Sequence, residues 1–271
     1  MNESPLLTEK LARRLEGAGV RFSVDWIDSI RRASTALGVE LERFGAAVGS
    51  ACRARPELDF MNRVGGLWPE DEPRVGEIAA FYRERGLRPW FELVPADGFE
   101  RLAARLSEIG AAQIGFHAML YGLPEPAPTP QEVRVRELEP EEVGSFADVL
   151  LEGHGVPAEH RAEARRGIEG WPHVDGWRLY LAEVEGEPVA AAVLSIADGI
   201  GYLANASARP AFRCRGCQTA LVGRRIADAN AAGCELVCGQ AGFASASQRN
   251  LQRAGLRLAY TKAVWRIRAG P

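Results

Sequence analysis

Apolar and polar residues follow one another in the second half of the chain in a pattern that predicts a strand, two helices and a three-stranded meander. The segment VRVREL, residues 133–138, alternates as a half-buried strand does. The helix after it has one apolar face, formed by Val143, Phe146, Ala147 and Leu150. A charged helix is expected near residues 158–169. Three strand patterns follow, WRLYLAEV, EPVAAAVLSI and GIGYLANASA, and the Glu-Gly and Asp-Gly pairs between them predict tight turns.

The pattern then changes to helix, strand, helix and strand. The segment GCQTALVGRRIADANAAG predicts a helix with Val222, Ile226 and Ala229 on one face. The segment ELVCGQA predicts a short strand and ASASQRNLQRAG a helix. The segment LAYTKAVWRI is expected to close the domain as its last strand.

Part of the first half repeats this later order. The segments NRVGGL, PWFELV and FHAMLYG predict strands, and RVGEIAAFYRERG and GFERLAARLSEIG predict the helices between them. The glycines that end the helices recur at similar spacing, from Gly86 to Gly110 and from Gly233 to Gly255. We therefore expect two copies of one fold.

The segment GLPEPAPTPQE, residues 122–132, carries four prolines and no core-forming period. It predicts an extended, exposed connection. The expected division is a first domain over residues 1–123, a linker over 124–130 and a second domain over 131–271.

Composition excludes several classes of protein. The 271 residues carry a net charge of -3, with 46% apolar residues, and lack the basic excess that nucleic-acid binding usually needs. No apolar run approaches the ~18 residues of a membrane span, and MNESPLLTEK does not resemble a signal peptide. We expect a cytoplasmic protein that binds neither nucleic acid nor membrane. The five cysteines, an odd number, suggest reduced thiols.

Two cysteine pairs raise the question of a zinc site, because AFRCRGCQTALV at residues 211–222 precedes CELVC at 234–238. Four thiolates would have to converge on one ion. The helix expected between the pairs, from Gln218 to Ala231, would span about 21 Å and separate them. No metal is expected here.

The start of that helix has residues that suit a diphosphate. A helix N-terminus offers unpaired backbone amides and the positive end of the helix dipole. Gly216 has no Cβ to keep phosphate oxygens away from the backbone, and Arg213 and Arg215 add charge-assisted hydrogen bonds. The same residues also suit a capped loop with solvated arginines.

The block ASARPAFRCRGCQTAL, residues 206–221, resembles motif A of the GCN5-related N-acetyltransferase (GNAT) superfamily, and SASQRNLQRAGL resembles the family's following helix. The resemblance implies an α/β (α+β) chain with two GNAT-like domains, each a mixed, mostly antiparallel sheet flanked by helices. The first domain has WPEDEPRVG where the phosphate site would be, and its acidic residues would repel phosphate. It is expected to be a degenerate lobe without a pyrophosphate loop.

The resemblance also implies that acetyl-CoA is the co-substrate, with no metal, and that an amine attacks its thioester directly. Backbone groups at Ala206 and Ala208 would pair with the pantetheine arm, and the amides of residues 215–219 would hold the pyrophosphate. The expected coenzyme-binding residues are Ala206, Ala208, Arg213, Arg215, Gly216, Cys217, Gln218, Thr219, Ser247 and Asn250.

Two positions depart from the family pattern. Gln218 stands where the motif has its last Gly or Ala, and Leu251 stands where the family often has a proton-donating tyrosine. The catalytic residues are therefore left unassigned. Ser247, Tyr202 or water could protonate the thiolate, although a serine in a first helical turn is commonly a cap. His154, His173 and Glu183 are candidate bases, although loop histidines are usually solvated and Glu183 can lie on an outward strand face. Trp171 and Trp177 are expected to pack, and Arg249 to reach the coenzyme or remain solvated.

The function predicted from the resemblance is N-acetyl transfer from acetyl-CoA to a primary amine of a small molecule. Two alternatives stay open: a non-catalytic module that binds or senses acyl-CoA, and an acyltransferase that uses another acyl-CoA. A homodimer is possible.

Overall fold

The computed structural model describes residues 4–125, 130 and 132–268, so residues 126–129 of the predicted linker and residue 131 of the predicted second domain lie outside the described residues. The chain divides into two compact units. Unit 1 comprises Met1–Leu7 with Leu120–Ala259, and unit 2 comprises Thr8–Met119 with Tyr260–Pro271. This division differs from the predicted one at both ends of the chain, because each terminal segment groups with the unit formed mostly by the other half.

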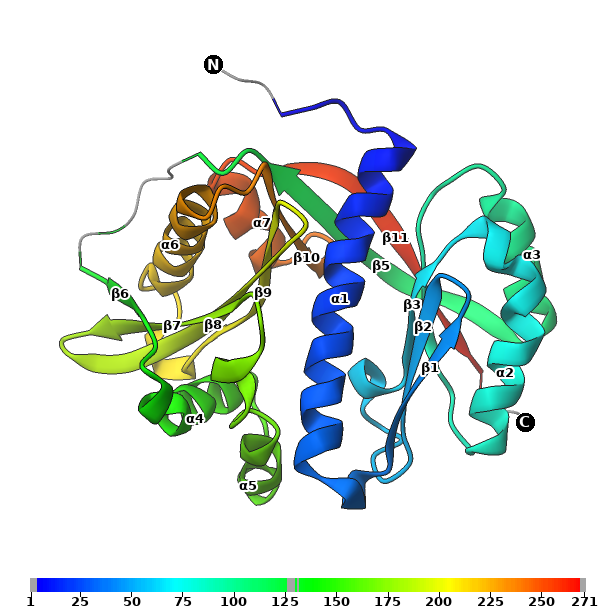
Figure 1. Cartoon of the computed structure of the whole chain (residues 1–271), viewed down its shortest axis with the longest axis horizontal. Helices are drawn as coiled ribbons and strands as arrows, with labels where there is room; N and C mark the ends of the chain where they lie inside the picture. Colours follow the sequence, from blue (N-terminus) through cyan, green and yellow to red (C-terminus); the bar gives the residue numbers. More distant parts are fainter. Residues whose placement is uncertain (1–3, 126–129, 131, 269–271) are drawn as a thin grey trace. The chain divides into compact units, whose positions relative to one another are not determined.

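Unit 1 contains the elements that the sequence pattern predicts (Figure 1), and their bounds confirm the predicted segments closely. They are β6 (Arg134–Glu137), α4 (Val143–Gly153), α5 (Ala158–Arg166), β7 (Trp177–Val184), β8 (Glu187–Ala197), β9 (Ile200–Ala208), α6 (Cys217–Ala231), β10 (Leu236–Gly242) and α7 (Ala246–Arg253).

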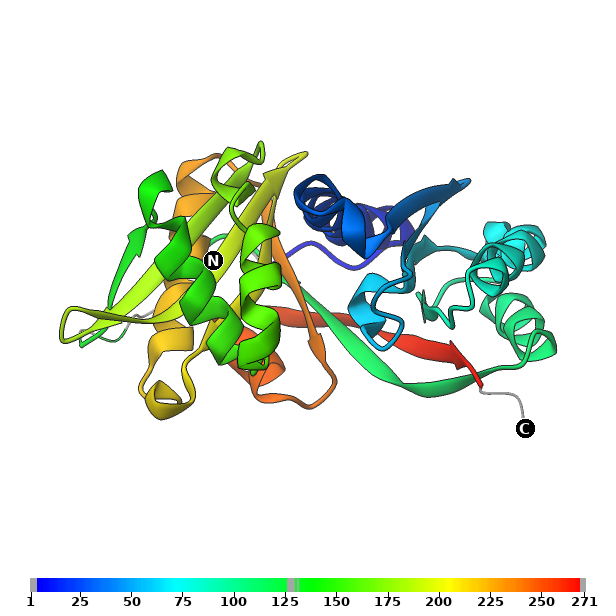
Figure 2. The same ribbon diagram turned by 90° about the horizontal axis from the view of Figure 1, so that it is seen from below.

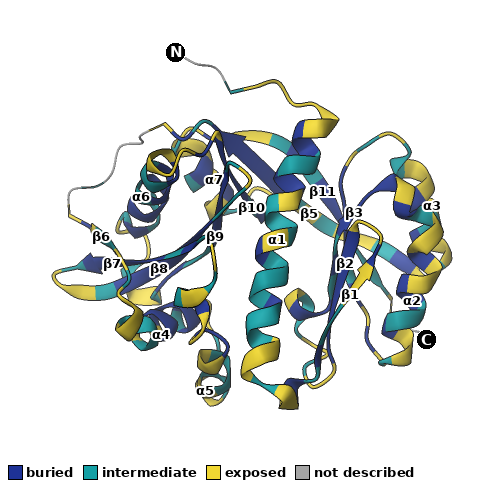
Figure 3. Cartoon of the chain, viewed as in Figure 1, coloured by how far each residue is buried: buried dark blue, intermediate teal, exposed yellow. Residues whose placement is uncertain are grey.

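The strands of unit 1 lie in the order β10-β9-β8-β7-β6. The pairs β6–β7, β7–β8 and β8–β9 are antiparallel, and β9–β10 is parallel. Helices cover both faces of this sheet (Figure 2). The central strand β8 is therefore buried from Val189 to Ser195 (Figure 3), which explains why its sequence reads as a continuous apolar run.

Unit 2 has the elements α1 (Glu9–Ala33), β1 (Val39–Phe44), β2 (Ala47–Cys52), β3 (Arg63–Leu67), α2 (Val75–Glu84), β4 (Trp90–Leu93) and α3 (Phe99–Glu108). Its strand order is β1-β2-β3-β4-β11-β5. The elements from β3 to α3 agree with the predicted repeat. The sequence pattern did not predict α1, β1 and β2. Helix α1 begins at a Thr8 cap, whose side chain accepts a hydrogen bond from the amide of Leu11.

Two long strands, β5 (Ala111–Gly122) and β11 (Arg257–Ile267), cross the boundary between the units. The predicted last strand, LAYTKAVWRI, was expected to close the second domain. Instead, Ala263–Arg266 of β11 pair antiparallel with β4 in unit 2. The predicted fold class, a mixed and mostly antiparallel sheet flanked by helices, is confirmed.

Lys262 is buried in unit 2 between two buried carboxylates. Its Nζ lies 2.7 Å from Glu92 and 3.1 Å from Glu16. The Tyr260 hydroxyl donates to Glu16 at 2.8 Å, and His117 Nδ1 lies 2.6 Å from Glu92. Burial alone would raise the pKa of Glu92, but the ammonium of Lys262 and the hydrogen bond with His117 outweigh burial and hold that pKa well below its usual value.

Replacing Lys262 by methionine is expected to destabilise unit 2 by about 3–5 kcal/mol at neutral pH, since two buried carboxylates lose their cation. The folded-state pKa of Glu92 is depressed, so its stabilising contribution is present above its unfolded pKa and is lost as the pH falls. The cost of Lys262→Met should therefore shrink between pH 7 and about pH 4, because burial without the ammonium favours the neutral, protonated form of Glu92 in the variant. Urea denaturation at both pH values measures this, with the exposed Lys10→Met as control. A cost that does not change with pH would contradict the assigned coupling.

Candidate acetyl-CoA site

The parallel strands β9 and β10 pair at one end and leave their other ends open. Their paired residues are Leu236–Cys238 on β10 and Ile200–Tyr202 on β9, whereas β9 continues to Ala208 and β10 to Gly242. The pairing between β9 and β10 therefore ends at Tyr202 and Cys238. The backbone of Ala206 and Ala208 belongs to the part of β9 beyond the pairing, so one edge of β9 is available there for an extended ligand.

A bulge interrupts β9 at the same place. Val193 of β8 pairs with Ala204 and Ala191 pairs with Ser207, so Ala192 faces both Asn205 and Ala206. Asn205 has a left-handed φ of 36°. Its side-chain nitrogen is buried and has no hydrogen-bond partner among the residues that the structure describes. The bulge therefore places the Asn205 side-chain amide, a hydrogen-bond donor, beside the unpaired edge of β9. It also changes the direction of the backbone at this point.

Two packing contacts hold β9 around this bulge. On one side, the Ser207 hydroxyl donates to the carbonyl of Leu150 in α4 at 2.9 Å. A Cβ on Gly153 would lie 2.5 Å from Ser207 Oγ, so α4 can approach β9 this closely only with glycine there. From α6, Arg225 donates to the carbonyl of Ala204 at 3.1 Å. The sequence pattern predicted no role in the site for Asn205, Ser207 or Arg225.

Arg225 is 2% exposed although it carries a charge. Burial lowers the pKa of Arg225 to about 10, so the guanidinium stays protonated at neutral pH. A detectable signal was present in the sequence, because residue 225 lies on the apolar face that contains Val222, Ile226 and Ala229.

Helix α6 begins directly after Gly216, which has a left-handed φ of 82° and provides no side-chain cap. Cys214 is also left-handed, with a φ of 62°. Such a backbone can turn successive amides toward one point, as in anion-binding nests. A Cβ on Gly216 would lie 3.0 Å from Pro130 Cγ, so both its conformation and its surroundings favour glycine. The predicted glycine at the helix start is thus structurally required.

The two predicted arginines have different surroundings. Arg213 donates to the carbonyl of Gly153 at 3.0 Å and so connects the loop to the end of α4. Arg215 is exposed, and its guanidinium carbon lies 5.4 Å from the Phe212 ring centroid. Arg215 is therefore the better placed of the two to meet a phosphate from solvent.

The first turn of α6 contains the remaining predicted residues of the cradle. Gln218 and Thr219 are half-buried and Cys217 is buried. The first intrahelical hydrogen bond of this helix runs from the Ala220 amide to the Gly216 carbonyl at 3.0 Å. The amides of residues 217–219 precede it and have no partner within the helix, as at any helix N-terminus. These amides and Arg215 fit a diphosphate.

Helix α7 contains the other predicted coenzyme residues. Ser247 is exposed and Asn250 is half-buried, with Asn250 Oδ1 accepting a hydrogen bond from Arg253. The expectation that Ser247 caps this helix is wrong, because Ser245 accepts the hydrogen bond from the amide of Gln248. Leu251, at the family's tyrosine position, is 5% exposed and belongs to the core.

Arg249 donates to the carbonyl of Ala244 at 2.7 Å. Its guanidinium is thus bonded locally, at the start of α7, rather than being fully solvated.

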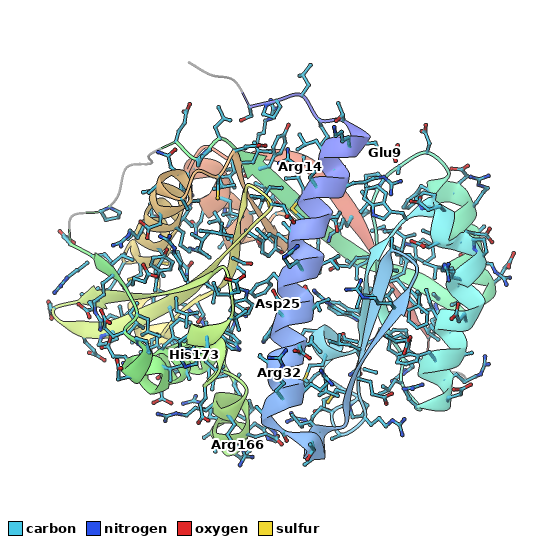
Figure 4. All side chains as sticks on the ribbon, in the orientation of Figure 1. Glu9, Arg14, Asp25, Arg32, Arg166 and His173 are labelled. Carbon is cyan, nitrogen blue, oxygen red and sulfur yellow. The ribbon has the colours of Figure 1, made fainter. Side chains whose placement is uncertain are left out.

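The candidate bases lie in three different environments. His154 follows α4 and is exposed, although the surrounding protein desolvates its ring and lowers its pKa. His173 is exposed in the turn Trp171–His173 (Figure 4). The expectation of an outward-facing Glu183 is wrong, because its carboxylate is buried and lies 2.6 Å from Arg136. Arg136 also binds Glu142, so Glu183 belongs to a structural ion-pair network.

The expectation that Trp171 and Trp177 pack is confirmed. Both are buried, and their rings meet edge to face at 5.3 Å.

The cysteine pairs occupy opposite ends of α6. Cys214 is exposed, whereas Cys217, Cys234 and Cys238 are buried. In the described part of the chain, no three His, Cys, Asp or Glu side chains are grouped so that they could hold a metal ion.

Unit 2 differs at the corresponding positions. Its parallel pair β3–β4 also has a bulge, at Gly65 and Gly66, but pairing resumes at Leu67 with Leu93. At the start of the following helical segment, the Asp71 carboxylate accepts a hydrogen bond from the Trp68 amide at 3.1 Å. In unit 2 the Asp71 carboxylate thus accepts a hydrogen bond from a backbone amide at this position. In unit 1 no side chain of the N-cap residue Gly216 caps the start of α6.

The helices within residues 4–125 and 132–268 include none that is both long and apolar enough to span a membrane.

No curated protein sequence matches the chain. Among solved structures, a GCN5-related N-acetyltransferase from Kribbella flavida is similar over 92% of this chain and 95% of its own, with 18% identity and a TM-score of 0.61. A GCN5-related N-acetyltransferase from Sphaerobacter thermophilus covers 83% of this chain and 78% of its own, at 15% identity and a TM-score of 0.60.

A tandem GNAT protein from the clavulanic acid biosynthesis pathway covers 77% of this chain and 75% of its own, with 15% identity and a TM-score of 0.57. At these identities the solved structures establish the fold. The family model of the acetyltransferase (GNAT) domain matches residues 136–243, which include the bulge of β9 and the start of α6. The predicted resemblance of this segment to the GNAT superfamily is therefore confirmed.

Proposed function

We propose that the protein transfers the acetyl group of acetyl-CoA to a primary amine of a small molecule, with unit 1 as the working domain. The observation that carries this proposal is the open edge of β9 beyond Tyr202, which lies in the same domain as the uncapped start of α6. Together they provide a backbone edge for an extended pantetheine arm and amides for a pyrophosphate. Unit 2, whose strand pair is closed, would support the fold.

In the proposed reaction the amine nitrogen attacks the thioester carbon. A carbon–nitrogen bond forms, the carbon–sulfur bond breaks, and CoA leaves as a thiolate that takes up a proton while the nitrogen loses one. Backbone amides at Ala206 and Ala208 would hold the developing oxyanion and the arm, and most of the rate would come from positioning. The acid and base remain unassigned. We also propose a cytoplasmic location and leave a homodimer open.

A second candidate function is binding of an acyl-CoA without turnover. Leu251 is buried where the family often has a proton donor, and Glu183 is neutralised by Arg136. Both observations are compatible with a sensing module or with an enzyme that relies on water for proton transfer. A longer acyl group on the donor is the remaining alternative.

Calorimetric titration with acetyl-CoA, followed by thiol release across a panel of small amines, tests the proposal. Binding with amine-dependent release of CoA is expected. Binding without release for any amine would favour the sensing module, and the absence of binding would contradict both functions. Titration with CoA esters of increasing chain length distinguishes the donor.

Charge reversal at Arg215 is expected to weaken acetyl-CoA binding about tenfold or more, because an exposed cation beside the cradle becomes an anion. The difference should decrease as salt screens it. Calorimetry at low and high ionic strength measures the effect of Arg215→Glu. The matched control Arg83→Glu makes the same change in net charge on the exposed side of α2. Equal weakening by both variants would mean that only net charge matters.

Bound acetyl-CoA should slow the alkylation of Cys214. This thiol is exposed two residues before Gly216, whereas the other four cysteines are buried. Iodoacetamide labelling followed by mass spectrometry should show Cys214 reacting first, and saturating acetyl-CoA, which has no free thiol, should protect it. Cys214→Ser identifies the labelled site. Labelling that is unaffected by saturating ligand would mean that the pyrophosphate does not lie at this loop.

A further inference from the structure

Arg225 is a buried cation in the working domain that the reaction described above does not use. Its side chain is 2% exposed, and no carboxylate pairs with it in the described part of the chain. The neighbouring Arg224 differs, because it forms an ion pair with Asp228 at 2.9 Å and remains partly exposed. A buried charge without a counter-ion is costly, so its hydrogen bonds have to provide the compensation.

Those hydrogen bonds go to backbone carbonyls. Arg225 Nη1 donates to the carbonyl of Val193 on β8 at 2.9 Å and to that of Ala204 on β9 at 3.1 Å. Its Nε donates to Leu221 within α6 at 3.0 Å. Val193 and Ala204 are the last paired residues before the bulge. The guanidinium therefore connects the two strands where the bulge begins.

The peptide group that joins Ala204 to Asn205 leads directly into the left-handed residue. Asn205 has a φ of 36°, a conformation that costs a non-glycine residue about 1 kcal/mol or more and persists only where the surroundings fix it. A cationic donor on the Ala204 carbonyl fixes one side of that peptide group and also polarises it. The orientation of the next amide, that of Ala206, follows from the conformation of Asn205.

We propose that Arg225 is a positioning residue for acyl transfer: by bonding the carbonyls of Val193 and Ala204, it fixes the β9 bulge and thereby directs the Ala206 amide at the thioester carbonyl. This inference rests on the proposed function, since it concerns the same acetyl-CoA site. Arg225 acts through the backbone and does not touch the ligand. Arg225 lies in α6 beyond the amides of residues 217–219, so we expect coenzyme affinity and carbonyl polarisation to be separable.

Infrared difference spectroscopy with acetyl-CoA labelled with carbon-13 at the carbonyl tests the assignment. In the unaltered protein, the carbonyl band should move to lower frequency than in free acetyl-CoA, because a directed amide polarises it. Arg225→Met should lose more than half of this shift, while its calorimetric Kd for acetyl-CoA changes less than about threefold. Arg224→Met, the same substitution one residue earlier, is the matched control and should keep the full shift.

The outcomes separate the two proposals. An unaltered protein that binds no acetyl-CoA overturns the proposed function and this assignment with it. Normal binding and a full carbonyl shift in folded Arg225→Met overturn the assignment alone and leave the function standing. A merely structural role would weaken binding and lower the melting temperature without a selective loss of the shift, and that result also contradicts the assignment.

A second pair of variants is needed because Arg225→Met removes a cationic donor from two backbone carbonyls and can fail to fold. Arg225→Gln retains a neutral donor and should lose most of the shift, so it decides the question if the methionine variant is unfolded. Arg225→Lys retains the cation and should recover more of the shift than glutamine does. Equal, full shifts in the glutamine and lysine variants would overturn the assignment. With an acceptor amine identified, the same order should appear in kcat rather than in the KM for acetyl-CoA.

Discussion

One edge of β9 stays unpaired at the place where its other edge remains in the sheet, and contacts from two helices of unit 1 hold the strand there. An open edge is normally a liability, because its backbone groups lack partners. Here the antiparallel pairing with β8 continues to Ala208, while the parallel pairing with β10 covers Tyr202 and no residue after it among those described. The bulge at Asn205 and Ala206 changes the direction of the strand between these points. Packing from α4 at Ser207 and from α6 at Ala204 then holds the changed direction.

In unit 2 the parallel strands β3 and β4 pair again after their bulge, unlike β9 and β10 in unit 1. Its bulge is retained at Gly65 and Gly66, and Glu92 of β4 lies opposite to it. Glu92 is buried and is bonded to Lys262, so the interior beside this bulge is occupied by charges of the protein itself. The Asp71 carboxylate similarly uses a backbone amide at the start of the following helical segment. The two units thus share a bulged strand followed by a helical segment. They differ because in unit 2 a carboxylate of the protein binds a backbone amide at the start of that segment.

The sequence predicted most elements of the fold because their signals are local. Apolar periodicity located α4, α6, α7 and the meander, and the glycine at residue 216 marked the start of α6. The features that shape the candidate site depend on pairing between distant residues. The bulge at Asn205 can be recognised only from the register between β9 and β8. The placement of most of β11 in unit 2 likewise depends on its pairing with β4. Glu183 looked available in the sequence because nothing local reveals Arg136 across the strand pair.

The four arginines in and beside α6 show why residue type alone did not assign their roles. Arg213 is bonded to the end of α4, Arg224 is neutralised by Asp228, and Arg225 is buried against the bulge. Arg215 is exposed beside the uncapped start of α6, and its guanidinium carbon lies 5.4 Å from the Phe212 ring centroid. Of these four arginines, Arg215 is therefore the best placed to bind a phosphate from solvent. Binding of a diphosphate here should consequently depend on backbone amides and on that one side chain, whereas its neighbours determine the shape of the strand and loop that present them.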